Sequence, residues 1–182
     1  MISEKEQIRD ELLVLKCRRG DHAAWHELIE LWRPRLFYFV RRLVPTEADA
    51  WDVLQQTWIG AYEGIDRLQD TRQLAPWLYR IARNKSIDYR RRLSSHEPLD
   101  EDADDSPTPE DEQLAFDNVE SVHLALDRLS LAHREALTLY FLEDLSVDAI
   151  AQVLGVPPGT VKSRLHHAKQ ELRIILEPEV KP

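Results

Sequence analysis

The residues with the clearest chemical potential lie at positions 74–92, in the stretch LAPWLYRIARNKSIDYRRR. Read as a helix, this stretch places apolar side chains such as Leu78 and Ala82 on one side. Its polar side chains fall on the other side: Arg80, Arg83, Asn84 and Arg91. A face of guanidiniums and one amide suits a negatively charged, hydrogen-bonding partner such as nucleic acid. A solvated basic face that complements the helix dipole is the alternative, and this stretch alone leaves it open.

A second informative stretch covers positions 145–173, LSVDAIAQVLGVPPGTVKSRLHHAKQELR. Ser146 can cap a short helix, Gly155 can end it, and Pro158 suits the first turn of the next helix. In that next helix the outward positions carry polar and basic side chains: Lys162, Ser163, His166, His167 and Gln170. This pattern predicts a helix-turn-helix, and an αα-hairpin that only packs is the open alternative.

The elements that must position these residues are also helical. Apolar spacings of three and four predict helices over about 3–19, 22–43, 46–65 and 74–92, with Asp21 and Thr46 as N-caps and Asp49 completing a capping box. Residues 66–73 read as a loop. The four helices carry all five tryptophans, so we expect them to form a compact bundle.

The net charge of −9 over 182 residues is concentrated in one segment. Residues 94–117 hold ten acidic residues, three prolines and no Lys or Arg, which predicts an extended, flexible linker. A simple tether is one interpretation of it, and a polyanionic strand that occupies a basic channel is another. Residues 1–93 carry a net charge of +3, so the acidic total does not exclude nucleic acid.

Several classes of protein are disfavoured by composition. No apolar run is long enough for a membrane span and no secretory signal is visible, so we expect no membrane insertion. The single Cys17 fits a reducing cytoplasm. His22 and His26 lie one turn apart but have no third ligand nearby in the sequence, so we expect no metal and no cofactor. No nucleophile motif or phosphate loop points to an enzyme.

Taken together, the chain resembles the extracytoplasmic-function (ECF) sigma factors of the sigma-70 family. The resemblance rests on DAWDVLQQTW at 49–58, PWLYRIARNKSIDYRRR at 76–92 and the stretch from 145 to 172. It implies an all-α fold with two helical domains: a four-helix sigma region 2 bundle at 1–93 and a region 4 helix-turn-helix domain at 118–182. The acidic linker at 94–117 joins them.

The resemblance also implies a function in transcription initiation. Proteins of this family are not enzymes; they bind core RNA polymerase, recognise the −10 and −35 promoter elements and help to melt the DNA. Many are held inactive by an anti-sigma factor. These three partners and a cytoplasmic location are therefore expected here.

The same resemblance assigns residues to three surfaces. The expected −10 contacts are Arg72, Gln73, Trp77, Arg80, Arg83, Asn84, Lys85 and Arg91. The expected −35 contacts are Thr160, Lys162, Ser163, Arg164, His166 and His167. The expected polymerase contacts are Asp49, Asp52, Gln55, Gln56 and Trp58.

The chain departs from the family pattern in its loop LQDTRQL at 68–74, in the His166–His167 pair and in the acidity of its linker. The alternative function is a stand-alone helix-turn-helix regulator that binds duplex DNA without polymerase. An adaptor that binds only proteins is a third class, and it predicts no DNA binding in any context.

Overall fold

The computed structural model describes residues 4–94 and 124–176, and within these two ranges the regular structure is helical throughout. The predicted all-α fold class is therefore confirmed. The N-terminal range holds α1 (Glu4–Arg18), α2 (His22–Arg41), α3 (Glu47–Gly64), the 3-10 helices η1 (Ile65–Arg67) and η2 (Thr71–Gln73), and α4 (Leu74–Ser94). The C-terminal range holds α6 (Leu131–Leu137), the π-helical turn η3 (Thr138–Leu142), α7 (Val147–Leu154) and α8 (Pro158–Leu176). The predicted linker lies outside the described residues apart from Ser94.

The helix starts follow the capping signals in the sequence. The Asp21 side chain accepts hydrogen bonds from the backbone N–H groups of Ala23 and Ala24 at 2.9 and 3.1 Å, which begins α2. Thr46 and Asp49 form the predicted capping box at the start of α3, with each side chain accepting a bond from the other residue's backbone N–H. Both cap predictions are confirmed.

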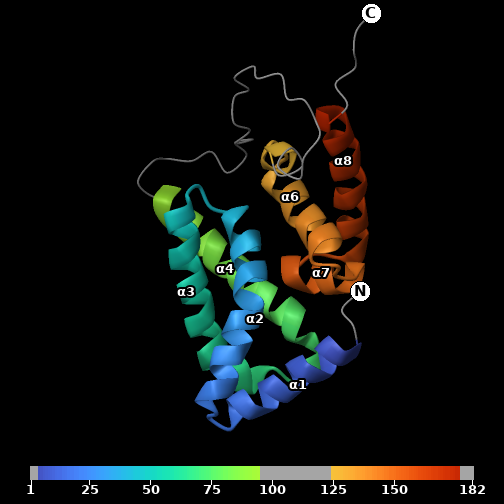
Figure 1. Ribbon diagram of the computed structural model, residues 1–182. Coiled ribbons are helices and arrows are strands. Elements are labelled where there is room, and N and C mark those ends of the chain that lie inside the picture. The colour runs from blue at the N-terminus through green and yellow to red at the C-terminus, as the bar shows by residue number, and fades with distance from the viewer. Residues whose placement is uncertain (1–3, 95–123, 177–182) are drawn as a thin grey trace, which may run out of the picture.

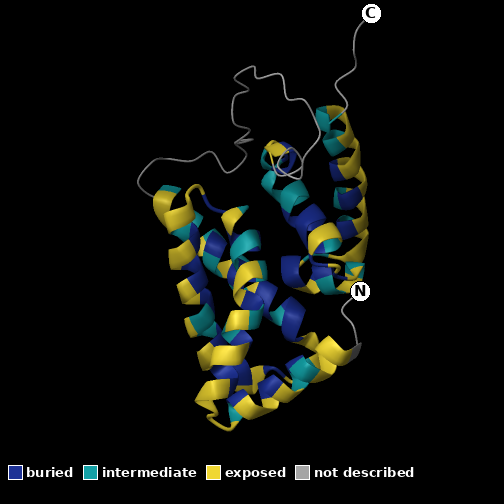
Figure 2. Ribbon diagram, in the orientation of Figure 1, coloured by how far each residue is buried: buried dark blue, intermediate teal, exposed yellow. Residues whose placement is uncertain are grey.

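The N-terminal bundle, defined here as α1 to α4, packs large apolar side chains into its centre (Figures 1 and 2). Leu28, Leu36 and Phe39 of α2 are fully buried, and so is Tyr79 of α4. The Tyr79 ring meets the Phe39 ring edge-on at 5.2 Å between centroids. These contacts fix how α4 lies against α2, and thus which side of α4 is left for solvent.

The C-terminal bundle is defined here as residues 124–176, which include α6 to α8, and the Ser130 hydroxyl caps α6. Ser146 caps α7 by accepting a bond from the Ala149 backbone N–H at 3.2 Å. Gly155 follows α7 with φ +67°, a left-handed conformation that costs glycine little. The predicted helix-turn-helix of α7 and α8 is thereby formed as the sequence indicated.

The two bundles pack directly against each other (Figure 1). α4 lies against α7, and the buried side chains of both bundles belong to one continuous apolar cluster. Three ion pairs also cross between the bundles: Arg35–Glu143, Arg42–Asp127 and Arg83–Glu135. This packing could not be predicted from the sequence, because the two stretches of helices are separated by the acidic segment.

Candidate nucleic-acid interface

α4 is held close to α3 by two glycines. A Cβ on Gly60 would lie 3.3 Å from the Ile81 Cγ2 atom, and a Cβ on Gly64 would lie 3.3 Å from Cζ2 of Trp77. The α3–α4 contact therefore has little room for a side chain at either glycine. Trp77 and Lys85, two of the predicted −10 residues, are half-buried on this side of α4.

The outward side of α4 carries the other basic and amide groups. Arg80, Asn84 and Arg91 are exposed, and their spacing of four and seven residues places them along one side of the helix. Arg72 and Gln73 are exposed in η2, directly before α4. Five of the eight predicted −10 residues are therefore exposed on η2 and α4.

Arg72 is oriented by a carboxylate within its own turn. Its Nε and Nη2 atoms donate to the two oxygens of Asp70 at 3.0 and 3.2 Å, and this hydrogen bonding lowers the pKa of Asp70. Asp70 also caps η2 by accepting a bond from the Arg72 backbone N–H. The loop LQDTRQL therefore has a defined shape rather than the irregular one that its sequence suggested.

Arg83 differs from its neighbours, because it faces the C-terminal bundle. Its Nε donates to Oε1 of Glu135 at 2.8 Å, and the Glu135 side chain is only 2% exposed. Burial raises the pKa of Glu135, although the neighbouring Arg83 acts in the opposite direction. In this packing, a predicted phosphate contact is occupied by a carboxylate from α6.

The predicted polymerase contacts lie on α3, on the far side of the molecule from α8 (Figure 1). Asp52, Gln55 and Gln56 are exposed, whereas Trp58 is half-buried. Asp49 caps α3 and accepts a 2.5 Å hydrogen bond from the Tyr89 hydroxyl, which lowers the pKa of Asp49. Asp49 thus has a structural role in joining α3 to α4.

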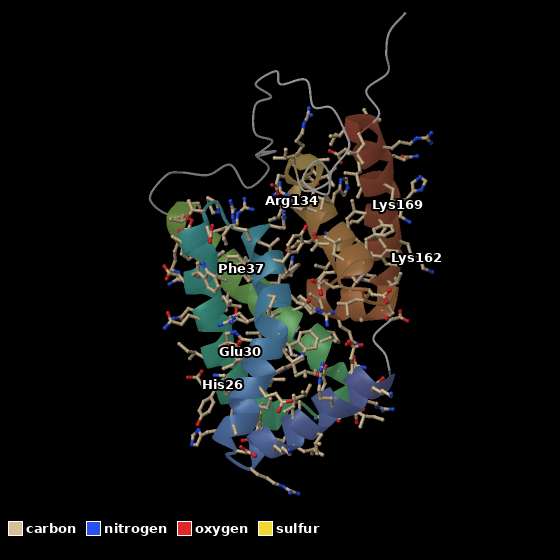
Figure 3. All side chains as sticks on the ribbon, viewed as in Figure 1. His26, Glu30, Phe37, Arg134, Lys162 and Lys169 are labelled. Carbon is tan, nitrogen blue, oxygen red and sulfur yellow. The ribbon has the colours of Figure 1, made fainter. Side chains whose placement is uncertain are left out.

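Sequence reasoning missed an apolar strip on the same helix. Trp51, Ile59 and Tyr62 are 47%, 44% and 60% exposed, and together with Gln55 they follow a helical spacing along one side of α3. The Trp51 ring stacks on Phe37 of α2 at 4.2 Å (Phe37 is labelled in Figure 3). The signal was present in the spacing 51, 55, 59, 62, and such a strip is typical of a surface that binds protein.

α8 presents the predicted −35 residues on the side turned away from the N-terminal bundle, where Figure 3 labels Lys162. Lys162, Ser163, His166 and His167 are exposed. The two other predicted residues, Thr160 and Arg164, are half-buried. The His166 and His167 rings meet edge-on at 5.5 Å between centroids.

Within the described parts of the chain, no group of three or more His, Cys, Asp or Glu side chains is arranged to hold a metal ion. Nor does any helix there combine the length and apolarity that crossing a bilayer requires.

A bundle with a basic outer helix, followed by a helix-turn-helix, defines a two-part helical DNA-binding protein. The family models for sigma-70 region 2 and sigma-70 region 4 match residues 28–96 and 120–172. The ECF RNA polymerase sigma-E factor of Haemophilus influenzae is 31% identical, over 95% of this chain and 98% of its own length. The ECF RNA polymerase sigma factor SigW of Bacillus subtilis is 26% identical, over 88% of this chain and 92% of its own length.

Solved structures agree with these relatives. The sigma factor RpoE of Bartonella quintana, in complex with the anti-sigma factor NepR, has a TM-score of 0.69 and 26% identity, over 85% of this chain and 97% of its own. CnrH in complex with the cytosolic domain of CnrY has a TM-score of 0.69 and 25% identity, over 94% of this chain and 99% of its own. The chain belongs to the ECF group of the sigma-70 family, and it is an RNA polymerase sigma factor.

Proposed function

We propose that the outward surface formed by η2 and α4 holds the non-template strand of the −10 element. Arg80 and Arg91 are placed to neutralise phosphates, and the exposed amide of Asn84 can donate to and accept from a base edge. Arg72 and Gln73 precede them on the same surface. The observation that carries this proposal is the exposure of these polar groups on a helix whose opposite side is buried.

We propose that α8 enters the major groove at the −35 element. Lys162, Ser163, His166 and His167 are the exposed candidates for base and phosphate contacts, whereas Thr160 and Arg164 are half-buried. Lys162 is an exposed ammonium on this side of α8 and provides a cationic contact to phosphate.

We further propose that α3 binds core RNA polymerase through Asp52, Gln55 and Gln56, with the apolar strip of Trp51, Ile59 and Tyr62 beside them. Partly buried aromatic side chains next to polar ones are typical of protein interfaces. Trp58 is half-buried on the same helix and packs against the core.

The protein then acts by binding rather than by catalysing a reaction, and it works in the cytoplasm with polymerase. One of its structural neighbours, RpoE of Bartonella quintana, was solved with an anti-sigma factor, which supports an anti-sigma partner for this chain as well.

Promoter binding requires the two bundles to separate. The −10 and −35 elements lie about 25 base pairs apart, which is about 85 Å along B-DNA. α4 packs on α7, and α8, which follows α7 after a short turn, is only about 28 Å long at 1.5 Å per residue. The chain between Ser94 and Leu124 can span about 100 Å when extended, which is enough for both elements to be bound at once.

Reconstituted transcription tests the proposal. The full chain is combined with bacterial core polymerase and a promoter-fragment library, and the initiating promoters are then assayed with Asn84→Ala and Lys162→Ala variants. Each substitution is expected to reduce initiation about tenfold or more, since a good base contact contributes about 1–3 kcal/mol. A Gln152→Ala variant, at an exposed position of α7, is the control. Tight duplex binding without any association with core polymerase would instead favour the stand-alone regulator.

A further inference from the structure

The side of the N-terminal bundle that meets the C-terminal bundle is basic. Three arginines line it, and we call them the arginine face: Arg35 of α2, Arg42, which is the C-cap residue of α2, and Arg83 of α4. The Arg35 guanidinium lies 4.5 Å from the centroid of the Trp32 ring, and that of Arg42 lies 4.9 Å from the Tyr38 ring. These cation–π contacts orient two of the three guanidiniums without neutralising them.

The C-terminal bundle supplies one carboxylate for each arginine. The three pairs are Arg35 Nε with Glu143 Oε2 at 2.9 Å, Arg42 Nη1 with Asp127 Oδ2 at 2.6 Å, and Arg83 Nε with Glu135 Oε1 at 2.8 Å. A further bond, from Arg134 Nη1 to the backbone oxygen of Arg42 at 2.9 Å, crosses the same junction.

Two of these carboxylates are buried at a cost. The side chains of Glu135 and Glu143 are 2% and 4% exposed, and burial raises the pKa of each above its ordinary value. Well-packed apolar residues would commonly stabilise a permanent contact at least as well as buried ion pairs. Ion pairs suit a contact that opens and closes, because the charged side chains on both sides are well solvated when the contact is open.

We propose that the arginine face binds the sugar–phosphate backbone of single-stranded DNA when the bundles separate, and that Glu135, Glu143 and Asp127 occupy it as phosphate mimics while they are packed. Carboxylate and phosphate oxygens accept from a guanidinium in similar geometry, so one set of arginines can serve both partners. Arg35 and Arg42 lie seven residues apart on α2, which is about 10 Å along the helix and within the reach of neighbouring phosphates on a strand.

This surface extends the promoter interface beyond the α4 residues that the sequence indicated. Arg83 lies on α4 itself, and Arg35 and Arg42 continue the basic surface onto α2. The inference rests on the proposed function in two respects: α4 is the helix that meets the melted strand, and the two bundles separate when promoter DNA is bound. It assigns α2 a contact with nucleic acid that its sequence pattern did not indicate.

The test measures binding of the full chain to a fluorescein-labelled single-stranded oligo(dT) 20-mer by anisotropy between 50 and 200 mM NaCl. Glu135→Gln combined with Glu143→Gln is expected to bind about tenfold more tightly than the unmodified chain. Adding Arg35→Ala and Arg42→Ala to this variant is expected to reverse the gain. It should also reduce the slope of log affinity against log salt by about 1.4, since each phosphate contact on a single strand contributes about 0.7.

Matched controls use the same helix. Glu30 and Arg33 form an exposed ion pair on α2, with Nη2 to Oε2 at 2.9 Å. Glu30→Gln and Arg33→Ala change the same charges away from the junction and are expected to alter binding less than twofold. Arg35→Lys with Arg42→Lys keeps the charge but loses the planar fork, so it should retain the salt slope while weakening affinity. If the alanine variants unfold, the affinity of the lysine variants for oligo(dT) tests the arginine face in their place.

Unchanged oligo(dT) binding by the two-glutamine variant would overturn the proposal, as would equal effects of Arg35→Ala and Arg33→Ala. Binding of a fluorescent oligo-glutamate peptide, with none of oligo(dT), would assign the face to an acidic protein partner instead. The proposed function fails by a different observation: no initiation by the unmodified chain with core polymerase.

Discussion

Replacing Arg134 by alanine should strongly destabilise the C-terminal bundle. The guanidinium donates to four backbone oxygens: those of Leu126 at 3.0 Å, Asp127 at 2.5 Å, Leu129 at 3.0 Å and Arg42 at 2.9 Å. The first three fix the chain that leads into α6, and the fourth reaches α2. The Arg134 side chain is 16% exposed, so water can replace only part of what the substitution removes.

The magnitude follows from these contacts. Hydrogen bonds from a charged group contribute about 1.5–3 kcal/mol each, but four of them cannot be added in full, because the arginine also loses its own hydration when it is buried. Burial lowers the pKa of Arg134, which reflects that cost. We therefore expect a net loss of about 3 kcal/mol, comparable to breaking a buried ion pair. For a small domain this corresponds to a fall in Tm of more than about 10 °C.

Urea unfolding of the full chain, followed by circular dichroism and by hydrogen exchange of the α6 and α8 amides, measures this effect. Arg128→Ala is the matched control, because Arg128 is exposed on the same segment and should cost less than about 0.5 kcal/mol. Arg134→Lys keeps the charge without the planar fork and should recover less than half of the loss. A loss below about 1 kcal/mol for Arg134→Ala would refute the reasoning.

Thr46→Ala should lower the stability of the N-terminal bundle by about 1 kcal/mol, because it removes the hydroxyl that accepts a hydrogen bond from the Asp49 backbone N–H. Thermal unfolding measures this, and a melting temperature equal to that of the unmodified chain would contradict it. Arg80→Ala should reduce the salt slope for a single-stranded −10 oligonucleotide by about 0.7, and an unchanged slope would remove Arg80 from the phosphate contacts.

Much of the fold was predictable because its signals are local. Asp21, Thr46 with Asp49, Ser146 and Gly155 each act on backbone groups within a few residues of themselves, so the sequence alone placed the helix starts and the turn of the helix-turn-helix. The boundary between the second domain and the linker, near residue 118, lies outside the described residues and stays a prediction.

The packing between the bundles was not predictable in this way. Periodicity shows that Arg83 shares a side of α4 with other polar groups, but it cannot show that Glu135, fifty-two positions later, covers it. Glu135 and Glu143 look like surface residues in the sequence, since isolated glutamates are rarely buried. Tyr79 was likewise overlooked as a core residue, although it is fully buried.

The glycine contact between α3 and α4 has a mechanical consequence. Because Gly60 and Gly64 have no side chains, Ile81 and Trp77 pack against the backbone of α3. The Tyr89–Asp49 hydrogen bond joins the same two helices near the opposite end of α4. These contacts join α3 and α4 at two separate places, so we expect a tilt of α3 to carry α4, and with it the exposed amide of Asn84, in the same direction.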